Sequence, residues 1–163
     1  MSDTPVETLL AELEEQERRL VLSRFTHDDA WRLGFLLVDT ARGRGLPVAV
    51  AIRRGAQLLF HHALEGTSAE NDAWLERKHR VVERYAASSY LVGRRFVARG
   101  TTFEESSRLD PGAYAAHGGA FPLRIHRVGV VGSVAVSGLR QADDHALVVE
   151  ALEQFLGEDL EQD

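Results

Sequence analysis

Cysteine is absent from this 163-residue sequence. Its absence excludes disulfides, thiolate nucleophiles, zinc-finger sites and iron–sulfur ligation. Long apolar runs are missing too, since no stretch approaches the roughly 18 to 20 apolar residues that a membrane-spanning helix needs. The acidic N-terminus also lacks the basic and then apolar layout of a signal peptide. We therefore expect a cytoplasmic protein with no membrane partner, in which any metal would have nitrogen or oxygen ligands.

Basic residues are fewer than acidic residues in this sequence. The chain has 19 Lys and Arg against 25 Asp and Glu, a formal net charge of -6. Nucleic-acid binding draws mainly on basic side chains that pair with phosphates, so the overall charge favours no such partner. Arg94, Arg95 and Arg99 do cluster, and we interpret them as a solvated helix face. The sequence predicts no nucleic-acid binding.

The length and composition are typical of one globular domain that spans residues 1–163. Hydrophobic residues make up 44% of the sequence and charged residues 27%. One core can serve a chain of about 100 to 200 residues. No internal repeat or low-complexity segment suggests a division.

Helical spacing and capping residues predict most of the helices. Thr4, Pro5 and Glu7 form a helix start, and leucines at helical spacing then predict an amphipathic helix over about 5–22. This helix either packs on the chain's own core or forms a subunit contact, and 19–25 could continue as a short strand. Thr26 with Asp29 forms a second capping box, and Ser68 precedes a long helix over 69–85. Shorter helices are predicted after Ser88 and Thr102, and a last one from about Gln141.

Alternating apolar residues predict two hairpins, over 48–63 and 121–136. In the first, Ala49 and Ala51 make one strand face small enough for a helix or a flat ligand to approach closely. His61 and His62 point to opposite faces, so they cannot jointly bind one metal.

Lys78 is the first candidate functional residue. On the helix over 69–85 it lies near Asn71 and Trp74 in a mostly apolar stripe. A lysine in such a stripe either extends its ammonium to water or anchors the carboxylate or propionate of a ligand. The sequence does not distinguish these two roles of Lys78.

The ends of the second hairpin carry the other candidates. His117, the backbone amides of Gly118 and Gly119, and the following helix start at Asp143, Asp144 and His145 could form a polar pocket over the sheet. Consecutive helical residues point about 100° apart, so the last three cannot all bind one metal. We predict no metal site. An Asp144–His145 pair in a hydrolase or isomerase is the weakest reading, because no catalytic motif accompanies it.

Three strings resemble a known family: PVAVAIRRGAQLLFHHALEGTSAENDAWLERK (47–78), AAHGGAFPLR (115–124) and GVVGSVAVSGLRQADDHALVV (129–149). They resemble the uncharacterised UPF0303 group within the wider GlcG and HbpS-like haem-degrading or haem-binding superfamily. The wider superfamily shares a looser pattern, matched at Gly118, Gly119, Pro122, 136–138 and Asp144.

This resemblance implies a profilin-like α/β (α+β) domain, with a mainly antiparallel central sheet between helices in three layers, and assembly into symmetric homo-oligomers. Some members of the superfamily bind or degrade haem. No haem-attachment motif is present here, and no histidine stands out as an axial ligand.

We expect a homo-oligomer that binds haem or a related planar anionic ligand, with catalytic residues and turnover unassigned. The alternative is a structural or adaptor oligomer without catalysis. The expected ligand-binding residues are Asn71, Trp74, Lys78, His117, Gly118, Gly119, Asp144 and His145.

Overall fold

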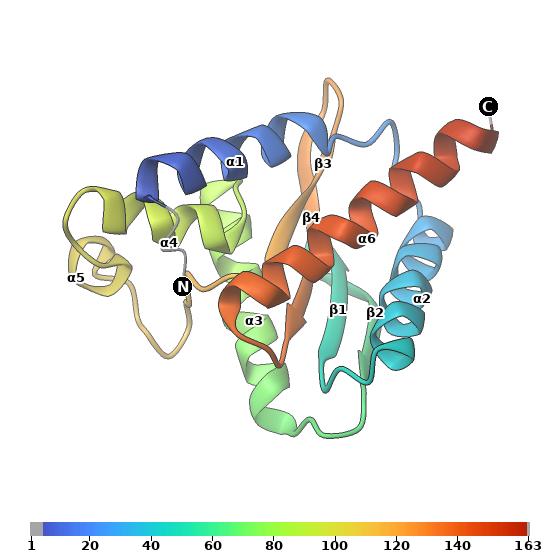
Figure 1. Ribbon diagram of the computed structural model, residues 1–163, viewed down its shortest axis with the longest axis horizontal. Helices are drawn as coiled ribbons and strands as arrows, with labels where there is room; N and C mark the ends of the chain where they lie inside the picture. Colours follow the sequence, from blue (N-terminus) through green and yellow to red (C-terminus); the bar gives the residue numbers. More distant parts are fainter. Residues whose placement is uncertain (1–4, 163) are drawn as a thin grey trace.

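The computed structural model describes residues 5–162, which form six helices and four strands (Figure 1). In chain order the elements are α1 (Val6–Arg19), α2 (His27–Gly43), β1 (Ala49–Arg54), β2 (Gln57–Ala63), α3 (Ala69–Tyr85), α4 (Ser89–Ala98), α5 (Phe103–Ser107), β3 (Ala120–Ile125), β4 (Gly129–Ser137) and α6 (Gln141–Gln162). Thr4, the predicted start of the first helix, lies outside the described residues. None of the described helices has the length and apolar character needed to cross a bilayer.

The four strands form one antiparallel sheet in the order β2-β1-β4-β3. The pairs β1–β2 and β3–β4 are the two hairpins that the alternating pattern predicts. The pairing of β1 with β4 joins the hairpins, with Val50 opposite Val136 and Ala49 opposite Ser137. This central pairing places the end of β4 beside the start of β1.

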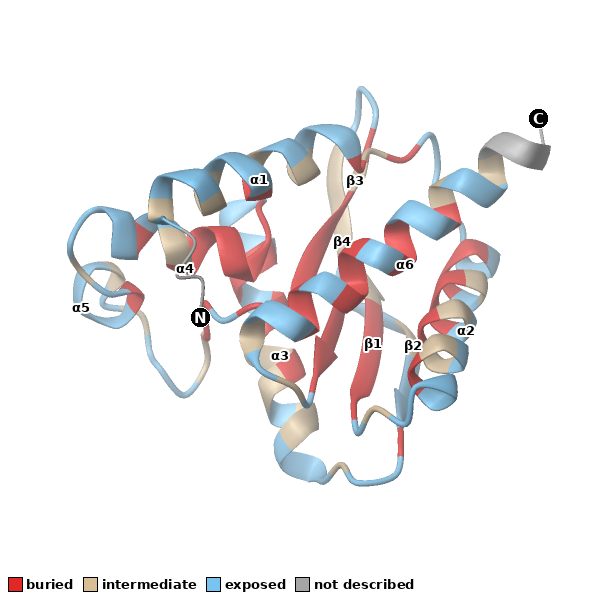
Figure 2. Cartoon of the chain, viewed as in Figure 1, coloured by how far each residue is buried: buried red, intermediate tan, exposed pale blue. Residues whose placement is uncertain are grey.

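Helices cover both faces of the sheet, which confirms the predicted three-layer α/β (α+β) architecture. Helices α2 and α6 lie on one face, where the large side chains of Val50, Ile52, Val134 and Val136 are buried. Helix α3 lies on the other face (Figure 1). Most of β1 and β3 and the second half of β4 are accordingly buried (Figure 2).

The face built from small residues is covered by helix α3. Ala49, Ala51 and Ala135 pack there against Leu75 and Val82 of the helix. Alanines let the helix backbone come close to the sheet, and no room is left for a flat ligand. The sequence allowed either a helix or a flat ligand on this face, and in the structure it is covered by the helix.

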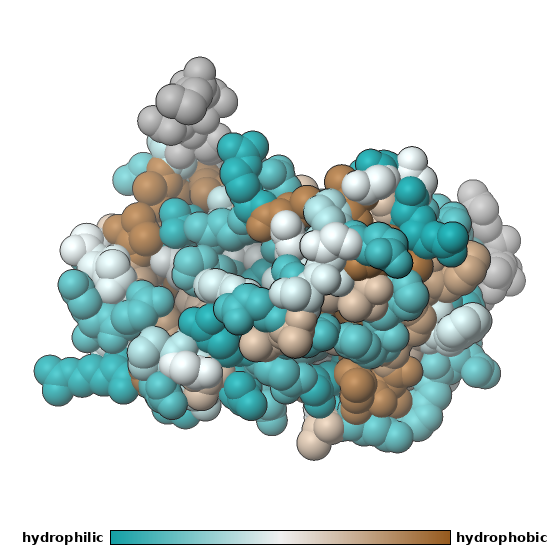
Figure 3. Space-filling view, turned by 90° about the horizontal axis from the view of Figure 1, so that it is seen from below, coloured by the Kyte–Doolittle hydropathy of each residue, from teal (hydrophilic) through white to brown (hydrophobic). Residues whose placement is uncertain are grey.

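Helix α1 packs within its own chain. Leu9, Leu10 and Leu13 belong to an apolar cluster with α4 and with Phe103 of α5. The apolar face of α1 is therefore used inside the protomer, as expected of a helix that packs on its own core. The surface seen from below is mainly hydrophilic, with small hydrophobic areas scattered over it (Figure 3).

The segment after α1 forms less strand than its sequence suggested. Only Leu22 makes a bridge, parallel to Ile125 of β3. Its N–H donates to the carbonyl of Arg124 at 2.8 Å, and its own carbonyl accepts from His126 at 2.8 Å. A single bridge is enough to hold this connection against the edge of the sheet.

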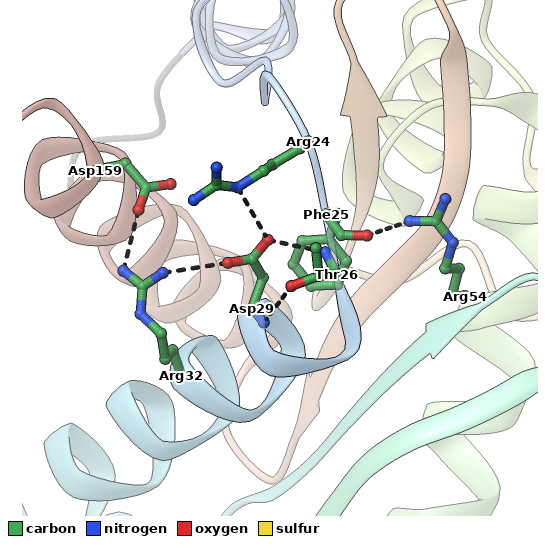
Figure 4. A network of polar contacts seen from close by, with 7 residues as sticks. All are labelled: Arg24, Phe25, Thr26, Asp29, Arg32, Arg54 and Asp159. Atoms are coloured by element: carbon green, nitrogen blue, oxygen red, sulfur yellow. Dashed lines mark hydrogen bonds and ion pairs between the residues drawn. The ribbon is translucent and has the colours of Figure 1, made fainter. Parts of the chain in front are cut away.

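The predicted capping box starts helix α2 and also ties it to α6 (Figure 4). The Thr26 hydroxyl accepts the Asp29 N–H at 3.0 Å, and the Asp29 carboxylate accepts the Thr26 N–H at 2.8 Å. Arg32 then donates to Asp29 at 3.1 Å and to Asp159 of α6 at 3.0 Å. The two helices on this face of the sheet are thereby joined by charge-assisted hydrogen bonds.

Candidate functional site

A pocket of about 420 Å³ lies between the N-terminal half of α3 and the turn that leads from β4 into α6. These segments lie side by side at the lower end of the sheet in Figure 1. The lining residues are Asn71, Trp74, Lys78, His117, Ser137, Gly138, Leu139, Gln141 and Asp144. Five of the residues predicted from sequence therefore meet in one pocket.

Lys78 is buried at the inner wall of this pocket. Its side chain is 4% exposed, and its ammonium donates to the carbonyl of Val136 at 3.0 Å and to the carboxylate of Asp144 at 3.1 Å. Burial lowers the pKa of Lys78, while Asp144 opposes the shift. The side chain thus does not extend its ammonium to bulk water.

Asp144 holds the turn before α6 as well as the lysine. Its Oδ1 accepts the Leu139 N–H at 2.9 Å, and its Oδ2 accepts the Gly138 N–H at 3.3 Å together with the Lys78 ammonium. Burial raises the pKa of Asp144, and Lys78 and the two amides counteract that rise. Both oxygens of the carboxylate are thus engaged by donors from the protein itself.

Trp74 forms an aromatic wall with two partners. The ring of His117 meets it edge-on, with the centroids 5.2 Å apart. The guanidinium of Arg77 lies over the indole at 4.3 Å from the ring centroid, which is cation–π distance. The aromatic side of the pocket therefore has a positive charge beside it.

His117 is exposed at the pocket mouth, and its environment favours a neutral ring. Desolvation beside its neighbours lowers the pKa of His117; Glu104 opposes this, and Lys78, Arg77 and Arg94 lower it further. A neutral imidazole keeps a lone pair that can accept a hydrogen bond or bind a metal ion.

The two glycines that follow His117 shape the wall of the pocket from behind. A side chain at Gly118 would meet the carbonyl of Gln141 at 2.2 Å, and one at Gly119 would meet the carbonyl of Val136 at 2.3 Å and the ammonium of Lys78 at 2.7 Å. The Gly118 N–H donates to the Gln141 side chain at 3.1 Å. These glycines therefore permit the close approach of Gln141 and Lys78.

His145 lies away from this pocket, as the 100° step along a helix requires. It is buried beside a separate groove between α1 and α6, where its Nε2 lies 2.7 Å from the Gln16 side-chain oxygen. Its ring packs near Tyr90 and Phe121. Burial lowers the pKa of His145 to about 4. The structure does not bring His145 together with His117 and Lys78.

Sequence reasoning did not single out Ser137, Leu139 and Gln141 as pocket residues. The sequence could have indicated Gln141, because it lies within the family string VSGLRQADDH. The sequence patterns also missed His79 on the buried face of α3, which is hydrogen-bonded to Ser133 of β4 and has its pKa lowered by burial to about 3. Among the described residues no group of three or more His, Cys, Asp or Glu could hold a metal ion.

Comparison with known proteins identifies the family. The sequence model of the haem-degrading protein HbpS-like family matches residues 25–153. The chain belongs to the HbpS-like family. A UPF0303 protein of Streptomyces coelicolor is 66% identical over 158 residues, which are 97% of this chain and 100% of that protein. Within the HbpS-like family, the chain is thus similar to proteins named UPF0303.

Solved structures of this fold agree with that assignment. The crystal structure of the Ybr137w protein superimposes with a TM-score of 0.85 at 31% identity, and 97% of each chain is covered. The PduOC:heme complex gives a TM-score of 0.66 at 18% identity, covering 79% of this chain and 93% of that one. At that identity the likeness to the haem complex extends to the fold alone.

Proposed function

We propose that this HbpS-like protein binds a small anionic ligand in the pocket between α3 and α6, with haem or a related planar anion as the candidate ligand. The observation that carries the proposal is the meeting of the Lys78 ammonium with the aromatic pair Trp74 and His117 in a pocket of about 420 Å³, with the Arg77 guanidinium over the indole. Cationic groups beside a flat wall attract a flat anion. The family and the solved haem complex support the same ligand class.

The donor set of the pocket fits haem at one edge. His117 supplies a neutral imidazole, for which the described part of the chain provides no hydrogen-bond partner. It is the residue that would hold the iron, and the donors around Lys78 would hold a propionate. Bound haem would supply the redox and oxygen chemistry of its iron. His145, which is hydrogen-bonded to Gln16 of α1, has no part in this proposal.

A titration of the purified protein with haemin tests this function. We expect a shifted Soret absorption for haemin, weaker binding by His117→Ala, and unchanged binding by the matched control His126→Ala, whose exposed side chain lies in the β3–β4 turn. Iron-free protoporphyrin, followed by fluorescence, should still bind. A spectrum of free haemin alone would remove haem as a ligand, and unchanged binding by His117→Ala would remove His117 as the iron ligand.

The same proposal places the protein in the cytoplasm as a homo-oligomer, and a separate surface supports self-association. On α2, Trp31 is 63% exposed and Phe35 is 56% exposed, and Leu58 on the adjacent strand β2 is 46% exposed. Strand β2 is also an edge of the sheet, and an edge strand can pair with its own copy about a two-fold axis. The alternative function, an adaptor oligomer without catalysis, would use this surface.

Light scattering distinguishes the two surfaces that the sequence and the fold suggest for assembly. Substitution of the exposed α1 residues Glu7 and Glu12 by Arg should leave the assembly number unchanged, because the apolar face of α1 packs on α4 within the protomer. An unchanged mass after substitution of both Trp31 and Phe35 by Glu would remove the α2–β2 surface from the proposal.

A further inference from the structure

Two side-chain amides of the pocket have their oxygens occupied by the protein backbone. The Oδ1 of Asn71 accepts the Ser68 N–H at 3.0 Å, as part of the capping box of α3. The Oε1 of Gln141 accepts the Gly118 N–H at 3.1 Å. A backbone N–H can only donate, so these contacts fix which end of each amide is the oxygen. In both residues the group left for a ligand is the NH₂.

The carboxylate of the pocket is also engaged, which leaves the ring of His117 as an acceptor. Both oxygens of Asp144 receive donors from the turn before α6 and from Lys78. The ammonium of Lys78 has three N–H groups, of which two are used on Val136 and Asp144. The lining therefore offers an incoming molecule amide and ammonium donors and few acceptors.

We infer that Asn71 and Gln141 determine the specificity of the pocket by donating from their NH₂ groups to a carboxylate of the ligand. This inference rests on the proposed binding function and adds which group of the ligand is recognised. A carboxylate has two oxygens in one plane, and two side chains that line the same pocket, one on α3 and one at the start of α6, can each supply a donor to it. A ligand that presents only donors, or a cation, finds no partner at these positions.

The charge balance favours a carboxylate over a phosphate. Lys78 is already paired with Asp144 at 3.1 Å, so this buried pair adds little net charge. Arg77 lies over Trp74 and donates to the carbonyl of Pro111 at 3.1 Å. A single negative charge needs less compensation in such a site than the charge of a phosphate close to −2.

Two isosteric substitutions test the inference. Asn71→Asp and Gln141→Glu keep the oxygen that accepts the backbone N–H and replace each NH₂ by an oxygen. Each adds a negative charge in the first turn of a helix, where it is favourable, so both variants should keep the fold. Gln57→Glu is the matched control, because it adds the same charge at an exposed position on β2.

Calorimetric titration with four flat probes gives the readout: benzoate, benzamide, benzamidine and phenylphosphate. We expect the wild type to bind benzoate most tightly. Each variant should bind benzoate roughly tenfold or more weakly, because a hydrogen bond to a charged group is replaced by repulsion. Benzamidine should bind the variants better than it binds the wild type, and Gln57→Glu should behave like the wild type. Gln141→Ala removes the donor without adding charge, and it should also weaken the binding of benzoate.

The outcomes separate the inference from the proposed function. If the wild type binds benzoate or haemin and both isosteric variants bind them equally well, the amides are not the contacts, and the inference falls while the binding function stands. A preference of the wild type for phenylphosphate would overturn the carboxylate assignment. If the wild type binds neither haemin nor protoporphyrin nor any of the four probes, the proposed function falls and takes the inference with it.

Discussion

The ammonium of Lys78 on α3 lies 3.1 Å from the carboxylate of Asp144 on α6, with the two side chains 4% and 2% exposed. Helix α3 covers one face of the sheet and α6 the other, so the pair connects the two outer layers around the end of β4. A buried pair of this kind is costly to break, because removal of one partner leaves an uncompensated charge.

Lys78→Met should therefore lower the free energy of unfolding by about 3 to 5 kcal/mol. Adding Asp144→Asn keeps one oxygen as an acceptor for the Leu139 N–H and removes the unpaired charge, so the double variant should be less destabilised than the sum of the two single variants. Urea denaturation of the four proteins gives the coupling free energy. Additive effects would mean that the two groups do not interact.

Two buried histidines should make the protein sensitive to acid. The pKa of His145 falls from 6.5 to about 4 and that of His79 to about 3, so the unfolded state takes up protons first as the pH drops below 6.5. Stability is fully present above that pH and should fall by about 2 kcal/mol per histidine between about pH 7 and pH 5. Glu17, whose pKa burial raises, opposes the loss, because its folded form binds a proton first.

Urea unfolding at a series of pH values checks this. His145→Asn cannot titrate in this range, so its stability should change less with pH than that of the wild type, by the contribution of one histidine. Parallel profiles for the two proteins would contradict the assignment.

Self-association should depend on the exposed aromatic surface of α2. Replacing Trp31 and Phe35 by Glu places two charges in that surface and should lower the mass measured by light scattering. Val128→Glu is the control, because Val128 is 69% exposed but lies in the β3–β4 turn. Loss of assembly in the control as well would point to a general effect of charge.

The two helical glycines Gly34 and Gly157 should respond in opposite ways to alanine. A Cβ at Gly34 would lie 2.4 Å from the ring of Phe60 on β2, whereas at Gly157 it would meet nothing within 4 Å. Gly34→Ala should lower the free energy of unfolding by about 1 to 3 kcal/mol through overpacking. The higher helix propensity of alanine offsets part of this loss. Gly157→Ala should stabilise by up to about 1 kcal/mol. Thermal unfolding of both variants decides whether α2 needs the glycine for contact with β2.

Local patterns were enough to predict the elements near the candidate site. The capping box of Thr26 with Asp29 and the N-cap residue Ser68 predicted two helix starts, because capping contacts lie within three residues of the cap. Alternation predicted both hairpins. The 3.6-residue period placed Asn71, Trp74 and Lys78 on one stripe, and the same geometry separated Asp144 from His145.

Contacts between segments far apart in sequence were not open to such reasoning. The oxygens of Asn71 and Gln141 are committed to backbone groups, and only the fold brings Gln141 to Gly118, 23 residues away. Likewise, no periodicity shows whether a lysine in an apolar stripe reaches water or finds a carboxylate. That choice depends on what lies 66 residues further along the chain.

The sequence by itself determined the family, the helices and strands and the set of polar residues, because family strings, caps and periodicity are local properties of the chain. Only the tertiary structure decided which of these polar residues share one pocket and which lie elsewhere. The pairing of β1 with β4 and the packing of α3 on the alanine face bring Lys78, His117 and Asp144 to one pocket, while α1 covers His145 elsewhere. These are long-range packing choices, in which burial and hydrogen-bond satisfaction select among arrangements that the local sequence allows equally.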